Sequence, residues 1–349
     1  MNRRLHDHLG DFLAAETDVK TGIDVSRELP RRRADRRQRA ERLTSPSMQE
    51  GQFSRTALGA AGHRAAHQIL EGGFFFADPL ALPILGADAQ AAIDKAKAEP
   101  LRRGLRLFIA LRSRFAEESA HAAIARGVRQ VVVLGAGFDT FAYRLAAPAG
   151  LRVFEVDHLA TQAEKRRRLE AARVAEPARV VYVGCDFETE TFVGALAAVG
   201  FDSHRPSFVF WLGVTAYLTH EAVYAALAAV AALPGGAEIV FDYVIPPEAI
   251  DRDTARAAHE ELARKVAAAG EPLRAYFDPP ALHAQLTALG FSEVEDLGVD
   301  EIAARYAPGR APTRRGAGAR LLRAATTAAP DPWPRPTAAP TTAPSPGKR

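Results

Sequence analysis

The sequence has a single cysteine, Cys185, among its 349 residues. One cysteine cannot form a disulfide within the chain, and it excludes a metal site built from several thiolates. The ten histidines show no ligand spacing of the H-E-x-x-H kind. These absences predict a protein that works without a bound metal.

Long hydrophobic runs are missing as well. No apolar stretch approaches the roughly 20 residues that a membrane-spanning helix needs. The first residues, MNRRLHDHLGDFLAAETD, contain acids where a secretory signal would have its hydrophobic segment. We therefore expect a cytoplasmic protein without a membrane partner.

Both ends of the sequence have few large apolar residues. Eight arginines lie between Arg27 and Arg42, and residues 324–349 contain seven prolines. Such segments cannot bury enough apolar surface to order themselves. We predict an Arg-rich disordered extension over residues 1–50, a domain over 51–323 and a Pro/Ala/Thr-rich disordered tail over 324–349. A nucleic-acid-binding arm is less favoured, because no aromatic residues are interleaved with the arginines for base stacking.

Between the ends, short β-branched runs alternate with longer segments of helical periodicity. This alternation predicts an α/β domain with a parallel sheet. The predicted strands cover residues 130–134, 152–156, 180–183, 207–211 and 238–244, with a late strand within 290–297. The predicted helices cover residues 159–175, 188–198, 220–233 and 279–289, and a mainly helical segment over 55–126 caps the sheet.

The first predicted strand runs directly into Gly135-Ala136-Gly137. Glycine allows a ligand to approach the backbone closely, and ligands of open parallel sheets bind beyond the carboxyl ends of the strands. The position therefore suits a cofactor, and an ordinary tight turn is the alternative.

About 20 residues further on, the second predicted strand is followed by Asp157. A carboxylate at this place can accept hydrogen bonds from the ribose hydroxyls of a nucleotide-like cofactor. Asp157 is favoured over Glu155, because it lies at the strand end where the cleft opens. The alternative is that Asp157 caps the following helix.

Asp186 and Phe187 follow the third predicted strand. The carboxylate could accept a hydrogen bond from an adenine amino group while the phenyl ring packs on the adenine. A glycine loop with distal acids fits both NAD and S-adenosylmethionine. The dinucleotide fingerprint requires a third glycine where this sequence has Thr140, which weakens the NAD interpretation.

Several motifs follow one another between Ser54 and Arg323, namely SRTALGAAGHRAA, DPLA, RSRFAEE, RQVVVLGAGFDTFAYRL, VFEVDH, GCDF and GVTAYLT. In this order they resemble the leucine carboxyl methyltransferase family, in particular its bacterial branch of S-adenosylmethionine-dependent methyltransferases. The resemblance implies a class I Rossmann-like fold, with a mostly parallel sheet, a late antiparallel strand and a helical N-terminal cap. It also implies S-adenosylmethionine as the cofactor.

The same resemblance assigns the cofactor-binding residues, which are Arg64, Arg112, Gly135, Ala136, Gly137, Asp157, Asp186 and Phe187. Arg112 would pair with the cofactor carboxylate, and Arg64 is a second candidate for that neighbourhood, since arginine can bind a carboxylate in a bidentate way. The sequence departs from the family pattern at two places. Leu212 stands where the family has a glutamate, and Phe141 follows Asp139-Thr140 where the family has an arginine.

The nature of the acceptor decides whether the protein needs a general base. A carboxylate acceptor is already ionised at neutral pH and needs none. A hydroxyl acceptor needs a base, for which His158 and Tyr217 are the weak candidates, although His158 also suits a helix start and Tyr217 also suits packing beneath the cofactor.

We therefore expect an O-methyltransferase that acts on a carboxylate of a small molecule or peptide. The alternatives are a hydroxyl O-methyltransferase of secondary metabolism and a non-catalytic cofactor-binding protein of the same fold. A nicotinamide-dependent oxidoreductase is the least favoured.

Overall fold

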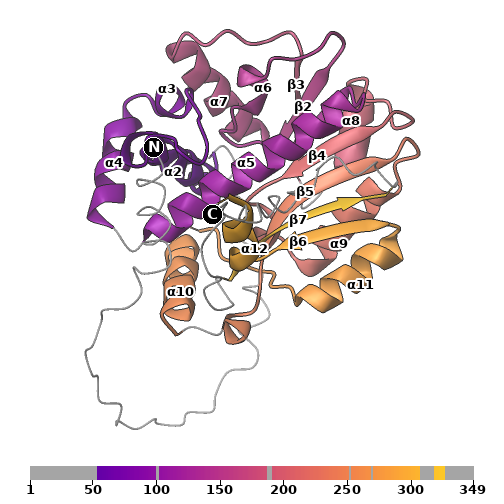
Figure 1. Cartoon of the computed structure of the whole chain (residues 1–349). Helices are drawn as coiled ribbons and strands as arrows, with labels where there is room; N and C mark the ends of the chain where they lie inside the picture. The colour runs from indigo at the N-terminus through magenta and orange to yellow at the C-terminus, as the bar shows by residue number, and fades with distance from the viewer. Residues whose placement is uncertain are drawn as a thin grey trace, which may run out of the picture.

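The described residues form a seven-stranded sheet with the strand order β3-β2-β1-β4-β5-β7-β6 (Figure 1). The structure is a computed structural model that describes residues 53–99, 102–186, 191–250, 253–268, 270–306 and 318–326. The strands are β1 Gln130–Leu134, β2 Arg152–Asp157, β3 Val180–Gly184, β4 Ser207–Trp211, β5 Ala237–Val244, β6 Glu293–Leu297 and β7 Ala319–Ala325. Strands β1 to β5 pair in parallel, whereas β7 pairs antiparallel with both β5 and β6. The predicted fold class is confirmed.

The direction in which the chain adds strands reverses beside β1. Strands β2 and β3 extend the sheet on one side of β1, and β4 and β5 extend it on the other. At such a switch point, the loops beyond the carboxyl ends of the strands separate and leave a crevice. The topology therefore places a binding site beyond β1 and β4.

Helices cover both faces of the sheet because the strands are apolar on both sides. The helices are α2 Arg55–Leu70, α3 Ala81–Leu85, α4 Asp88–Ala98, α5 Arg103–Ala125, α6 Phe141–Arg144, α7 Leu159–Ala171, α8 Phe192–Ala198, α9 His220–Ala231, α10 Asp253–Ala268, α11 Pro279–Leu289 and α12 Val299–Tyr306, with short 3-10 helices η2 Thr215–Tyr217 and η3 Pro247–Ala249. In β1, Val131 and Val133 belong to an apolar cluster that includes residues of α5, α6 and α12, whereas Val132 and Leu134 belong to one that includes residues of α8, α9 and α11.

The helices α2, α3 and α4 form the predicted N-terminal cap, to one side of the sheet (Figure 1). Helix α2 packs on α3, α4 and α5, and its buried face is made mostly of alanine and glycine. Small residues on this face allow the helices to approach closely. The cap therefore sits tightly over the carboxyl ends of the strands.

The predicted elements agree with the structure except near some of their ends. The helix expected over 159–175 stops at Ala171, and Arg173 then adopts a positive φ of 56°. The helix expected to begin at residue 188 begins at Phe192, and residues 187–190 lie outside the described ranges. The domain also continues past the predicted boundary at 323, because Ala324 and Ala325 belong to β7.

The remaining domain predictions concern residues that the structure does not describe. The extension over 1–50 and the tail beyond Thr326 lie outside the described residues. In the described parts of the chain, no helix has both the length and the apolar character to cross a bilayer. The cytoplasmic location stays a prediction.

Candidate functional site

A cavity of about 1260 Å³ lies between the carboxyl ends of the strands and the cap. The loops after β1, β2, β3 and β4 line one part of it, which we call the loop side. Residues of α2, α4, α5 and α10 line the other part, which we call the cap side. The cavity therefore opens at the switch point where the topology places a binding site.

The glycine loop forms the floor of the loop side. Gly135 and Gly137 have positive φ angles of 64° and 46°, a region that favours glycine. A Cβ atom at Gly135 would lie 2.4 Å from Cγ2 of Val214, so a side chain has no room there. The amides of Gly135 and Ala136 both donate to the carbonyl of Val156, at 2.8 and 3.1 Å. These contacts fix the backbone that a cofactor would approach.

Asp157 stands at the end of β2 and faces the glycine loop. Its Oδ2 atom accepts a hydrogen bond from the Gly137 amide at 2.6 Å, and its Oδ1 atom accepts one from the His158 amide at 2.7 Å. Burial raises the pKa of the Asp157 carboxyl, and the two backbone hydrogen bonds oppose that effect. Since each carboxylate oxygen has two lone pairs, Asp157 can still accept hydrogen bonds from a ribose.

The residue after Asp157 bears on the alternatives left open by the sequence. The N-cap of α7 is His158, whose Nδ1 atom accepts a hydrogen bond from the Ala160 amide at 3.2 Å. Asp157 is thus not the capping residue, and the structural interpretation of His158 as a helix-start residue is the one observed.

The end of β3 contributes Asp186 to the loop side. The Cys185 amide donates to the Asp157 carbonyl at 3.0 Å, which holds the ends of β2 and β3 together. Asp186 follows directly and lines the cavity. The other residue expected at an adenine, Phe187, lies outside the described residues.

Arg112 of α5 reaches the cavity next to the loop after β4. Its Nη1 atom lies 2.7 Å from Oδ2 of Asp242, and the other oxygen of Asp242 accepts the Gly213 amide. Gly213 has a positive φ of 72°, and a Cβ atom there would lie 2.7 Å from Nη2 of Arg112, so a larger residue would displace the guanidinium. The Nε atom of Arg112 is buried and has no hydrogen-bond partner among the described residues. The contact with Asp242 therefore holds the Arg112 guanidinium at the cavity wall.

Arg64 also lines the cavity but has protein partners. Its Nε atom lies 3.1 Å from Oδ2 of the fully buried Asp78, and its Nη2 atom donates to the Phe138 carbonyl at 2.6 Å. These contacts tie α2 to the glycine loop. The structure thus brings Arg64 to the predicted neighbourhood and uses part of its guanidinium to position the loop.

Tyr217 and the two departures from the family pattern lie in different surroundings. Tyr217 lines the cavity, and burial raises the pKa of its hydroxyl to about 12. Leu212 also lines the cavity. Phe141 does not; it is buried in the core, with its ring 4.9 Å from that of Phe210. Only the departure at Leu212 therefore affects the site directly.

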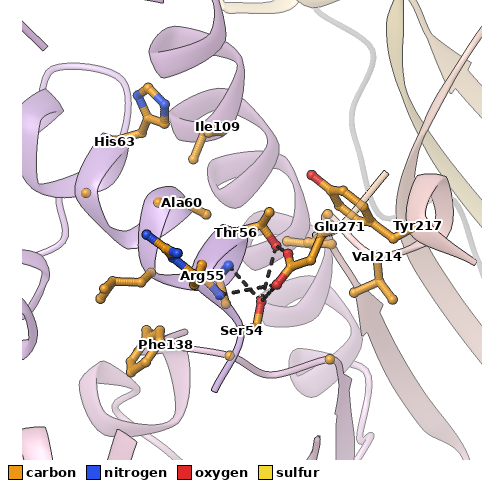
Figure 2. A pocket seen from close by; sticks show the side chains of 18 of the residues that line it. Ser54, Arg55, Thr56, Ala60, His63, Ile109, Phe138, Val214, Tyr217 and Glu271 are labelled. Carbon is orange, nitrogen blue, oxygen red and sulfur yellow. Dashed lines mark hydrogen bonds between the residues drawn. The ribbon is translucent and has the colours of Figure 1, made fainter. Parts of the chain in front are cut away.

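Glu271, just after α10, closes the cavity from the side of the cap. Its Oε1 atom accepts hydrogen bonds from the Ser54 hydroxyl at 3.3 Å and the Arg55 amide at 3.2 Å. Figure 2 shows that its carboxylate also contacts the hydroxyl of Thr56. The segment after α10 is thus bound to the start of α2. No motif in the sequence indicated this link.

His63 of α2 was also missed by the sequence interpretation. Its ring lies on the cavity wall near Ile109 (Figure 2). Burial lowers the pKa of the imidazole to about 3, and the positive charges of Arg102, Arg106 and Arg112 act in the same direction. His63 is therefore neutral at physiological pH.

The comparisons with known proteins point in one direction. A family model described as leucine carboxyl methyltransferase matches residues 57–231. YktD of Bacillus subtilis, named as a candidate S-adenosyl-L-methionine-dependent methyltransferase, is 34% identical over 194 residues, which cover 55% of this chain and 63% of YktD. A protein of Frankia alni with the same description is 36% identical over 184 residues, 51% of this chain and 64% of its own length. The matched part therefore spans less than two thirds of these relatives.

The solved structures found by comparison are more distant in sequence. A candidate methyltransferase from Thermobifida fusca is 18% identical, with a TM-score of 0.49, and the match covers 76% of this chain and 93% of that protein.

Proposed function

This chain belongs to the leucine carboxyl methyltransferase family, and on that basis we propose that it transfers a methyl group from S-adenosylmethionine to a carboxylate oxygen of a small-molecule or peptide acid. One observation carries the proposal. The loops after β1, β2 and β3 converge with Arg112 on a single cavity at the switch point of the sheet. Each of these groups matches one part of the cofactor.

The residues on the loop side fit S-adenosylmethionine. The glycine turn at Gly135 and Gly137, which lines the cavity, suits the methionine part, and the guanidinium of Arg112 on the cavity wall suits its carboxylate. Asp157 has lone pairs for the ribose hydroxyls, and Asp186 for the adenine amino group. When bound, the cofactor supplies an electrophilic methyl group on a positively charged sulfur.

The surroundings of the two candidate bases favour a carboxylate acceptor over a hydroxyl acceptor. Tyr217 keeps its proton at neutral pH, because burial raises its pKa to about 12. His158 uses Nδ1 to accept the Ala160 amide. A hydroxyl acceptor needs proton removal, whereas a carboxylate with a pKa of about 4 is already nucleophilic. The chain then has to align the acceptor and exclude water.

The cap supports the exclusion of water. Glu271 ties the segment after α10 to the start of α2, and Ala57 of α2 lies directly over Gly137. Removing water from around a carboxylate raises its reactivity toward the methyl carbon of a sulfonium. The O–C bond forms as the C–S bond breaks, and both charges are neutralised in this step, so the transition state loses less solvation than the separate ions do.

Calorimetric titration tests the cofactor part of the proposal. We expect S-adenosylmethionine and S-adenosylhomocysteine to bind, NAD not to bind, and Asp157→Ala to weaken the adenosyl ligands by at least about tenfold, because two hydroxyl contacts are lost. Asp94→Ala, on the exposed side of α4, is the matched control and should bind normally. Failure of the wild-type chain to bind either adenosyl ligand would remove the proposed activity.

Turnover tests the acceptor part. Formation of S-adenosylhomocysteine is measured with a panel of carboxylic acids. For each acid, it is also measured with the alcohol that has the same carbon skeleton. We expect turnover with acids and none with the alcohols. Turnover with alcohols alone would establish the hydroxyl alternative, and binding without any turnover would establish the non-catalytic one.

A further inference from the structure

The cap side of the cavity carries positive charge. Lys95 of α4, Arg102 at the start of α5 and Lys265 of α10 all line it. Two carboxylates lie beside these cations. Glu99 has Oε2 3.0 Å from Nη1 of Arg102 and Oε1 3.7 Å from Nζ of Lys265, and Oε1 of Glu261 lies 3.5 Å from the same Nζ atom. The pKa of the Glu99 carboxyl is lowered, since these cations outweigh the opposing effect of burial. Lys95 has no ion-pair partner among the described residues.

The pKa of His63 is affected by the same positive charges. After burial, the charges of Arg102, Arg106, Arg112 and Lys95 each lower the pKa of its imidazole. The ring faces the cavity and makes no hydrogen bond with the described residues (Figure 2). A neutral imidazole keeps one N–H donor for an anion. The N–H donor of His63 and the positive charges of the cap side thus line the same part of the cavity.

Apolar residues of the helices that surround these cations line the cavity beside them. They come from three helices, and they are Ala92 and Ala96 of α4, Leu105 and Ile109 of α5, and Leu262 and Val266 of α10. An occupant of the cavity therefore meets apolar side chains as well as the cations of the cap side.

The cationic wall does not suit the carboxylate that is methylated. Methyl transfer removes the negative charge of that group, so an ion pair with it would stabilise the reactant more than the transition state. A second anionic group keeps its charge throughout the reaction and loses nothing by binding to cations. The charge on the cap side is therefore better matched to a remote group of the acceptor.

Resting on the proposed function, we infer that the acceptor is a dicarboxylic acid with an apolar body. One carboxylate is methylated on the loop side. The other is bound on the cap side by Lys95, Arg102 and Lys265, with a hydrogen bond from His63.

Titration of the chain saturated with S-adenosylhomocysteine tests this inference. The probes are the straight-chain diacids from glutarate to sebacate and the monoacids of the same carbon number. We expect at least one diacid to bind about tenfold more tightly than its monoacid, and this preference to shrink as NaCl rises from about 50 to about 500 mM, because salt screens the cations.

The outcomes separate the inference from the function on which it rests. Equal binding of diacids and monoacids, or binding of neither, by a chain that binds S-adenosylhomocysteine overturns the inference and leaves the cofactor site intact. Absence of S-adenosylhomocysteine binding overturns the proposed function and the inference with it.

Charge-neutralising variants locate the second site. We expect Lys95→Gln combined with Lys265→Gln to weaken the preferred diacid by about tenfold, with monoacid and S-adenosylhomocysteine affinities unchanged within about twofold. Lys97→Gln combined with Arg264→Gln is the matched control, because both side chains lie on the same helices and are exposed outside the cavity. An equal loss in the control would show a general charge effect and overturn the assignment of these residues.

His63 provides an uncharged test of the same wall. We expect His63→Gln, which keeps an N–H donor, to bind the diacid more tightly than His63→Leu does. Equal affinities of the two variants would remove His63 from the site.

Discussion

Gly135 turns the chain out of β1 at a place where no side chain fits. Its φ of 64° disfavours other residues, and a Cβ atom would meet Val214 at 2.4 Å. We expect Gly135→Ala to lower the free energy of unfolding by about 2 kcal/mol or more. We also expect it to weaken the binding of S-adenosylhomocysteine by at least about tenfold, because the loop must move. Urea unfolding and calorimetry measure the two effects.

Gly127→Ala is the control for this substitution. Gly127 also has a positive φ, 109°, but a Cβ atom placed there would have nothing within 4 Å of it. It should therefore lose stability from backbone strain alone and keep its ligand affinity. Equal losses of affinity in the two variants would contradict the importance of the Val214 contact.

The residues of the site were predictable where a motif fixed their place. The glycine loop and Asp157 follow directly from the alternation of strands and turns, and the structure brings both to the cavity. Glu271 and His63 were not predictable in this way. Their contribution depends on how α2 and α10 close over the sheet, and no spacing along the sequence records that contact.

At the scale of elements, the link between α10 and α2 depends on Glu271. We expect Glu271→Ala to speed hydrogen exchange at the start of α2 by about tenfold, since a charged acceptor of several hydrogen bonds is lost, while β1 and β4 keep their protection. Glu261→Ala on α10 is the control, because its carboxylate pairs with Arg264 and Lys265 of the same helix and not with α2. Unchanged exchange at residues 54–58 would show that the link does not hold the cap.

The parallel strands were predicted closely, and β7 was not located. The strands from β1 to β5 are mostly apolar, as buried parallel strands are, with single acids such as Glu155 in β2 and Asp242 in β5. The segment Ala319–Ala325 instead contains two arginines and three alanines and has little strand character of its own. It becomes a strand because β5 and β6 pair with it. In addition, Arg320 forms an ion pair with Asp296, and Arg323 forms one with Glu238. This stabilisation comes from tertiary contacts, so the local sequence of the segment gives little indication of a strand.

At the scale of the whole molecule, the ionisation of Glu71 in the cap makes the stability of the fold depend on pH. Burial raises its pKa, but hydrogen bonds from His67 and Arg106 outweigh burial and lower the pKa to about 2. A carboxyl with a pKa lower in the folded state stabilises the fold above its unfolded pKa of about 4.5, and this contribution is lost as pH falls toward 2. We expect protonation of Glu71 to lower the free energy of unfolding of the wild type by up to about 3 kcal/mol.

Urea unfolding between about pH 6 and pH 3 measures this contribution. Glu71→Gln should be less stable than the wild type at pH 6, and the gap should narrow as pH falls. Glu170→Gln, on the exposed side of α7, is the control and should follow the wild type. A constant gap across the range would contradict the assignment to Glu71.

The position of β7 has a consequence for how the protein is made. It lies between β5 and β6, although it follows both along the chain (Figure 1). A ribosome adding about 5–20 residues per second delivers β7 several seconds after β5. During that time the nascent chain holds a strand edge without its partner, which is a site for chaperones or for aggregation. The sheet therefore closes only when synthesis has passed Ala325, and truncated translation products would be left with that edge open.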